Sequence, residues 1–191
     1  MKSRLGAALL IVAALVSGCS SPGAGRAVGP SCLPSGSSSA TSGPSGGPSS
    51  EAPVPAVQLA CFVGGAPASL ETLGKPAIVN LWAAWCEPCR TELPAIQQFA
   101  DRAGDRVKVI GVDSADSHAA AQSFIDDKRL TMTMLEDPDR RLLTAVHRSA
   151  LPATLFITAG GTLAFVYNAA PLDVAHVAAL AERYLGVTVP A

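Results

Sequence analysis

The segment LWAAWCEPC, at residues 81–89, constrains the fold more than any other part of the sequence. It holds both tryptophans of the chain and two cysteines, Cys86 and Cys89, that are separated by two residues. The apolar run AIVNLWA, residues 77–83, is typical of a buried strand, and the pattern of residues 87–104 predicts an amphipathic helix. A CxxC pair between such elements serves as a zinc knuckle, a structural disulfide or a redox couple.

The net charge bears on the class of partner, and the positions of the histidines bear on whether the cysteine pair binds zinc. The formal net charge at pH 7 is -1 and no basic stripe runs along the chain, which argues against a nucleic-acid partner. A zinc site needs four ligands, commonly including a second close pair of cysteines or histidines. The three histidines are far apart and share no ligand-like spacing. The sequence therefore predicts no bound metal and no cofactor.

The N-terminus has the pattern of a processing signal. Lys2 and Arg4 precede the apolar run LGAALLIVAALV, which is too short for a comfortable membrane span. The run ends in VSGC, which resembles the bacterial lipobox, where the signal peptide is cut before a cysteine that then carries lipid. This resemblance implies a signal peptide at residues 1–18 and a lipid anchor at Cys19. The alternatives are an ordinary secretory signal or a short anchor, and each of them places the protein outside the cytoplasm, where disulfides are permitted.

Residues 19–55 are dominated by Ser, Gly, Pro and Ala and show no hydrophobic period. Such a composition cannot bury apolar surface, so we expect a flexible tether, followed by one folded domain at residues 56–191.

The cysteine count predicts a second disulfide. The chain has five cysteines, an odd number that is awkward in an exported protein. If Cys19 carries lipid and Cys86 pairs with Cys89, Cys32 and Cys61 remain as partners. Closing that loop would stabilise the fold by about 3–4 kcal/mol in the chain-entropy model. The alternative is that Cys32 and Cys61 form an exchangeable second redox pair.

After the tether, strand and helix patterns alternate, which predicts an α/β sheet made mixed by a final hairpin. The expected strands are residues 57–63, 77–83, 106–113, 131–137 and the hairpin of 153–158 with 162–167, and the expected helices are 87–104, 116–129, 138–147 and 172–186, with a helical turn at 69–74.

A cysteine at the start of a helix is suited to redox chemistry. Unpaired backbone N–H groups and the helix dipole favour negative charge there, so we expect a lowered pKa and a nucleophilic thiolate at Cys86. Cys89 lies one turn further on and would resolve a mixed disulfide. Pro88 fits the first turn, because its missing N–H would be unpaired in any case. Trp85 would shield the site and Trp82 would pack in the core.

The stretch LWAAWCEPCRTELP resembles the thioredoxin superfamily and, within it, the TlpA/ResA-like extracytoplasmic thiol-disulfide oxidoreductases. The resemblance covers roughly residues 58–186. It implies a thioredoxin fold with a central mixed sheet flanked by helices and a TlpA/ResA-like insertion at about residues 114–147. One feature that carries the resemblance is WCEPC itself, with Glu87 and Pro88 between the two cysteines.

Three further residues acquire a role from this resemblance. Glu92 would assist proton transfer near the cysteines. The segment ALPATLFI resembles the one that holds the cis-proline beside the active site, so Pro152 would be cis and would present the Leu151 backbone to an incoming peptide. Without the resemblance, Pro152 would be expected to be trans and Glu92 to be an exposed helix carboxylate.

Asn80 is a departure from plain thioredoxin, which carries a buried aspartate at that position as proton acceptor for the second cysteine. Asparagine cannot accept that proton, so the mechanism of thioredoxin does not transfer intact. TlpA/ResA-like proteins often show the same change, which increases the importance of Glu92.

These features predict a membrane-tethered thiol-disulfide oxidoreductase that exchanges its CxxC pair with the thiols or disulfides of exported proteins. We favour a reductase that receives electrons from a membrane partner, with cytochrome c maturation as one use, because CEPC resembles the motif of such proteins. The alternatives are a disulfide-forming oxidase and a non-catalytic binding lipoprotein. Peroxide reduction is disfavoured, because thioredoxin-fold peroxidases usually lack CxxC in this form.

Overall fold

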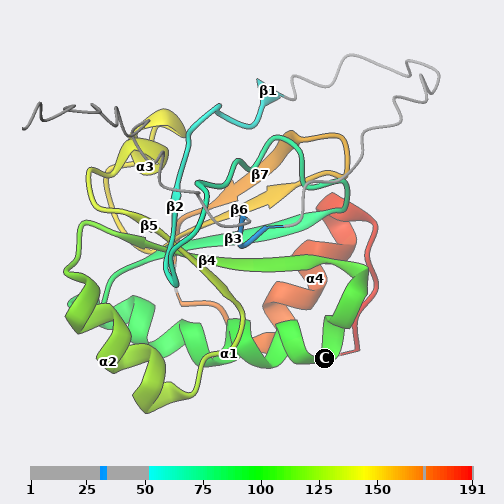
Figure 1. Ribbon diagram of the computed structural model, residues 1–191. Coiled ribbons are helices and arrows are strands. Elements are labelled where there is room, and N and C mark those ends of the chain that lie inside the picture. The colour runs from blue at the N-terminus through cyan, green and yellow to red at the C-terminus, as the bar shows by residue number, and fades with distance from the viewer. Residues whose placement is uncertain (1–30, 34–51, 170, 191) are drawn as a thin grey trace, which may run out of the picture.

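The computed structural model describes residues 31–33, 52–169 and 171–190, which form a mixed sheet with helices against both faces (Figure 1). The strand order is β1-β7-β6-β3-β4-β5-β2. The strands are β1 (Ala52–Pro53), β2 (Ala60–Cys61), β3 (Ala77–Trp82), β4 (Lys108–Ser114), β5 (Thr133–Asp137), β6 (Ala153–Ile157) and β7 (Thr162–Tyr167). The helices are α1 (Glu87–Ala103), α2 (His118–Lys128), α3 (Arg141–Ala145) and α4 (Val174–Leu185), with a 3-10 turn, η1, at Gly104–Arg106.

The centre of the sheet is β3, in which every residue is buried. It pairs in parallel with β4 and antiparallel with β6, so both of its edges and both of its faces are covered. This explains the continuous apolar run of the sequence, because a strand enclosed on all sides has no solvent-facing positions to make polar. Asn80 is the exception in the middle of the strand, and it belongs to the site described below.

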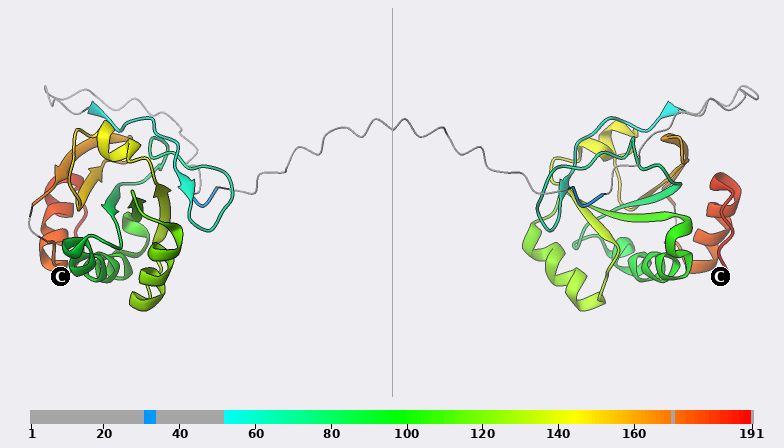
Figure 2. Two further views of the ribbon diagram at one scale, coloured as in Figure 1. Left: turned by 90° about the vertical axis from the view of Figure 1, so that its left-hand side faces the viewer. Right: turned by 45° about the vertical axis from the view of Figure 1, so that its right-hand side comes forward.

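Two apolar layers enclose the sheet. On one face, α1, α2 and α4 pack against side chains that include Ile78, Trp82 and Phe156. On the other face, α3 and the loops before β3 cover Val79, Leu81 and their neighbours. Figure 2 shows α3 on the opposite side of the sheet from α1 and α2. This arrangement confirms the expected mixed sheet flanked by helices.

The β6–β7 hairpin turns at Gly161, which has a φ of 78°. A Cβ atom at this position would lie 2.6 Å from the backbone oxygen of Glu71, so the loop before β3 approaches too closely for any side chain. The hairpin and the crossover from β4 through α2 to β5 complete the order of the sheet.

Parts of the expected tether contact the sheet. In the structure β1 pairs with β7, and Val54 and Leu33 are buried, although they lie in the range 19–55 assigned to the tether. Isolated apolar residues in a Ser- and Gly-rich stretch show no hydrophobic period, so their burial cannot be predicted from the sequence pattern. Each of them can nevertheless bury its side chain against a core that other elements form. Residues 1–18 and Cys19 lie outside the described residues.

Three elements differ from the sequence expectation. The strand expected at residues 57–63 is reduced to β2, and residues 69–74 form turns and bends rather than a helix. The helix expected at residues 138–147 begins only at Arg141, because Arg140 has a left-handed φ of 56° and ends the preceding turn. Within the part of the chain described here, no helix combines the length and apolar character needed to cross a bilayer.

Candidate active site

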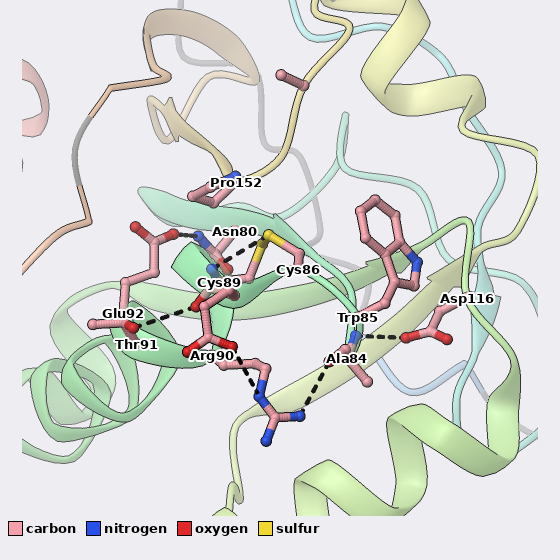
Figure 3. The surroundings of a disulfide bond; sticks show 12 residues. Asn80, Ala84, Trp85, Cys86, Cys89, Arg90, Thr91, Glu92, Asp116 and Pro152 are labelled. Atoms are coloured by element: carbon pink, nitrogen blue, oxygen red, sulfur yellow. Dashed lines mark hydrogen bonds and ion pairs between the residues drawn. A yellow bond between two sulfur atoms is a disulfide. The ribbon is translucent and has the colours of Figure 1, made fainter.

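The site is built on the N-terminus of α1, where Cys86 is the N-cap residue. Its backbone is extended, with φ -86° and ψ 104°, and its Sγ accepts a hydrogen bond from the backbone N–H of Cys89 at 3.3 Å. Cys86 and Cys89 form a disulfide with a Cα–Cα distance of 5.3 Å. Cys86 is 5% exposed and Cys89 is completely buried. Cys86, at the start of the helix, is therefore the more exposed of the two cysteines, and Figure 3 shows the disulfide at this helix end.

The residues between the cysteines fit the first helical turn. Pro88 lacks only an N–H that would have no intrahelical partner, and Glu87 is exposed with its negative charge at the positive end of the helix. Arg90 donates to the backbone oxygen of Ala84 at 3.1 Å and lies 3.9 Å from Glu87. The turn is thus tied back to the loop that precedes Cys86.

A second set of contacts fixes this loop against the end of β4. Trp85 is 62% exposed, and its Nε1 donates to the backbone oxygen of Ala115 at 2.9 Å. Asp116 accepts a hydrogen bond from the backbone N–H of Ala84. Trp82 is fully buried and packs against Phe124 of α2, which agrees with its expected place in the core.

The other side of the site is formed by the segment before β6. The Leu151–Pro152 peptide bond is cis, and Pro152 is buried. In Figure 3, Pro152 and Trp85 lie on opposite sides of the disulfide. Asn168 holds the segment, because its Nδ2 donates to the backbone oxygens of Pro152 and Ala150.

Glu92 is 1% exposed, so it is not the exposed helix carboxylate that its sequence position alone suggests. Its Oε1 accepts from Asn80 Nδ2 at 2.7 Å, and its Oε2 accepts from the backbone N–H of Leu172 at 3.1 Å. Burial raises the pKa of Glu92 above its ordinary value, and the two hydrogen bonds only partly oppose this. A buried carboxyl with a raised pKa is a better proton acceptor than an exposed glutamate.

Sequence reasoning missed three groups of the site, two of them in the Glu92 network. Asn80 Nδ2 also donates to Thr154 Oγ1 at 2.9 Å, and Thr154 is 1% exposed. The two residues face each other across the β3–β6 ladder. The polar Thr154 inside the apolar strand ATLFI was the available signal. The sequence contains no comparable signal for Asn168 or for the backbone N–H of Leu172, because their roles depend on the folding of distant segments.

The second disulfide joins Cys32 to Cys61 with a Cα–Cα distance of 5.8 Å. It lies at the β2 edge of the sheet, apart from the CxxC pair. Within the described ranges, no group of three or more His, Cys, Asp or Glu side chains is placed to hold a metal ion.

Comparison with known proteins identifies the family to which this chain belongs. Residues 51–166 match the AhpC/TSA family. The chain is 30% identical over 114 residues to sporulation thiol-disulfide oxidoreductase A of Bacillus subtilis, which covers 58% of this chain and 69% of that protein. It is 32% identical over 89 residues to thiol-disulfide oxidoreductase ResA of the same species, covering 46% of this chain and 50% of ResA.

A solved structure supports the same assignment. A secreted disulfide oxidoreductase of Mycobacterium tuberculosis, described as homologous to E. coli DsbE, superposes with a TM-score of 0.56 at 30% identity. The superposition covers 64% of this chain and 95% of that one. Together with the family match, this confirms the thioredoxin fold and the resemblance derived from the CEPC segment. The chain belongs to the AhpC/TSA family and is a thiol-disulfide oxidoreductase of the ResA and DsbE type.

Proposed function

We propose that the protein acts outside the cytoplasm and exchanges its Cys86–Cys89 pair with the thiols and disulfides of exported proteins. The observation that carries the proposal is the position of Cys86, a slightly exposed N-cap residue in a disulfide that Figure 3 shows near Pro152, which follows a cis bond. The M. tuberculosis structure is described as that of a secreted protein, which supports the location. The second disulfide, Cys32–Cys61, also suits an oxidising compartment.

In the reducing direction, the Cys86 thiolate attacks one sulfur of a substrate disulfide. A mixed disulfide forms and the other substrate sulfur leaves as a thiolate, which takes up a proton. Cys89 then loses its proton and attacks Cys86, which forms the Cys86–Cys89 disulfide and releases the second substrate thiol. The substrate gains two electrons and the protein loses two. The oxidising direction is the reverse of these steps.

Glu92 is proposed to accept the proton that Cys89 loses and to return it in the opposite direction. Its raised pKa suits both acceptance and release. The Leu151 backbone, held by the cis-proline segment, is proposed to align the substrate peptide, and Trp85 to shield the opposite side. Asn80 holds Glu92 in place and cannot itself accept the proton.

We propose reduction as the physiological direction, with electrons from a membrane partner, a lipid anchor at Cys19 after removal of residues 1–18, and cytochrome c maturation as one use. A disulfide-forming oxidase is the alternative. The reduction potential of the Cys86–Cys89 couple separates the two. A value near about -270 mV supports the reductase, and one near about -120 mV supports the oxidase.

The exchange activity is tested by insulin reduction with dithiothreitol, followed by turbidity. We expect the wild-type protein to shorten the lag before precipitation and Cys86→Ser to abolish the effect. Cys89→Ser retains the attacking sulfur, so its reduced form, mixed with insulin after dithiothreitol is removed, should trap a mixed disulfide that non-reducing electrophoresis detects. If wild type and Cys86→Ser behave alike, the chain uses this fold for binding rather than for exchange.

A further inference from the structure

A small acidic pocket lies next to the redox site. It has a volume of about 240 Å³ and is lined by Asp113, Asp116, His118, Glu136 and Pro138. Three of these residues are acids and none is Lys or Arg. The pocket is formed where the ends of β4 and β5 meet the start of α2. None of these residues takes part in the proposed exchange chemistry.

Asp113 is the residue that distinguishes this pocket from an ordinary acidic surface. The residue is 3% exposed, and its buried Oδ1 has no hydrogen-bond partner among the described residues. Burial, together with the negative charges of Asp116 and Glu136, raises the pKa of Asp113 to about 7. A buried carboxylate without a hydrogen-bond partner at one oxygen destabilises the folded protein, and a positive charge nearby would oppose that cost.

The other polar groups of the pocket already have partners. His118 Nδ1 lies 2.6 Å from Glu136 Oε1, and the His118 ring stacks on Phe62 with centroids 4.2 Å apart. Asp116 accepts from the backbone N–H groups of Ala84 and Ser117. The pocket therefore has a fixed frame of hydrogen bonds around Asp113, whose buried Oδ1 has no partner in the part of the chain that the structure describes.

The frame also joins the pocket to the redox site. Asp113 is in register with Trp82 on the neighbouring strand, and Asp116 holds Ala84, two residues before Cys86. Trp85 is fixed to the same loop through Ala115. Through these two hydrogen bonds the rim of the pocket is connected to the loop that precedes Cys86.

We propose that the pocket binds the basic side chain of a lysine or arginine that lies next to the reacting cysteine of a substrate protein. The positive charge would lie among three carboxylates and would stabilise the ionised form of Asp113. An organic cation is favoured over a metal ion, because no group in the described ranges has the geometry for a metal. This inference rests on the proposed function, since it names the substrates of the same site.

The test uses the reduced full chain and two synthetic peptides, each with one intramolecular disulfide. The peptides are identical except for one residue beside a cysteine, which is lysine in one and norleucine in the other. Each exchange rate constant is divided by that of the same peptide with dithiothreitol, which removes the effect of lysine on the intrinsic reactivity of the disulfide. We expect a lysine-to-norleucine ratio of about ten for the wild type, equivalent to about 1.4 kcal/mol.

The variant Asp113→Asn should reduce this ratio to about two or less. The matched control is Glu182→Gln, which removes one negative charge from the exposed face of α4 and should leave the ratio near ten. A wild-type ratio near one overturns the proposal without any variant. A high ratio that survives Asp113→Asn, or that Glu182→Gln lowers equally, overturns the assignment to this pocket. If neither peptide reacts faster than with a simple dithiol, the proposed exchange function has failed instead.

Discussion

Glu92 shows how one buried carboxyl can be both a structural and a chemical group. Both of its oxygens have donors, Asn80 Nδ2 and the backbone N–H of Leu172, so the side chain is held in one orientation. Its burial favours the protonated form, and this raises its pKa. The hydrogen bonds that position Glu92 lower its pKa, but burial outweighs them, so the carboxyl can take up a proton more readily than an exposed glutamate does.

Glu92→Gln tests this role without removing the packing. Glutamine has nearly the same shape as glutamate. In the wild type, Asn80 Oδ1 has no hydrogen-bond partner in the described part of the chain. In the variant the Asn80 side-chain amide can rotate by 180°, so that this oxygen accepts a hydrogen bond from the glutamine NH₂ group. We expect a folded protein whose exchange rate falls about a hundredfold, at the low end of the usual contribution of general acid–base catalysis. The pH dependence of cysteine alkylation should shift as well. Unchanged titration together with an unchanged rate would show that Glu92 has no part in proton transfer.

Asp113 gives the clearest prediction for pH and stability. Its pKa is raised from 3.8 to about 7, mainly by burial, so the folded state binds its proton more tightly than the unfolded state does. Between these two pH values the folded protein carries more protons, and its stability must fall as the pH rises. Asp113→Asn stays neutral. It should therefore be more stable than the wild type at pH 8, by up to about 4 kcal/mol, with the difference disappearing near pH 4.

Urea denaturation of wild type and Asp113→Asn across this pH range measures that difference. A constant offset between the two proteins at every pH would mean that the Asp113 proton is not linked to folding. A wild-type sequence that retains a destabilising carboxylate is consistent with a binding role for it, because functional sites commonly reduce stability.

At the level of secondary-structure elements, the sequence predicts the centre of the molecule well. Helix α1 was expected at residues 87–104 and is found at Glu87–Ala103, since Pro88 and the capping cysteine mark its start locally. Strand β3 was equally clear, because a fully enclosed strand must be apolar throughout. The position of the reactive cysteines therefore follows from local chemistry.

The start of α3 could not be predicted in this way, because it depends on a buried residue outside the helix. Asp137, at the end of β5, accepts from the backbone N–H groups of Arg141 and Leu142 at 2.9 and 2.8 Å. The sequence pattern predicts a helix that begins at Pro138, but Arg140 has a left-handed backbone conformation and the helix begins only at Arg141. Thr154 and Asn168 were missed for a similar reason, since their partners are distant in the chain.

Asp137→Ala should destabilise the protein by about 1–3 kcal/mol. It removes the acceptor of two backbone N–H groups, those of Arg141 and Leu142, which then have no partner unless the first turn of α3 unwinds. Exchange activity should persist, since α3 covers the face of the sheet opposite to α1. Chemical denaturation and the insulin assay measure the two properties. Asp139→Ala, an exposed aspartate two residues away, is the matched control and should unfold like the wild type. Equal unfolding midpoints for both variants would show that Asp137 does not stabilise the start of α3.

At the level of the whole molecule, the residues before β3 close both edges of the sheet. Strand β1 covers the edge beside β7, and β2 covers the edge beside β5. Exposed edge strands invite pairing with other chains, so short covering strands protect the fold. The Cys32–Cys61 disulfide fixes one of these segments to the β2 edge. A region that composition assigned to a tether thus contributes to the folded unit.

The double variant Cys32→Ala/Cys61→Ala tests whether this disulfide is structural or takes part in exchange. The bridge closes a loop with a sequence separation of 29 residues, so its loss should lower the stability by about 3–4 kcal/mol. For a domain of this size, that corresponds to a fall in Tm of about 10 °C. Below the new Tm, insulin reduction and the potential of the Cys86–Cys89 couple should match the wild type, because the two disulfides lie apart. Loss of exchange in a variant that is still folded would instead assign Cys32 and Cys61 to the electron pathway.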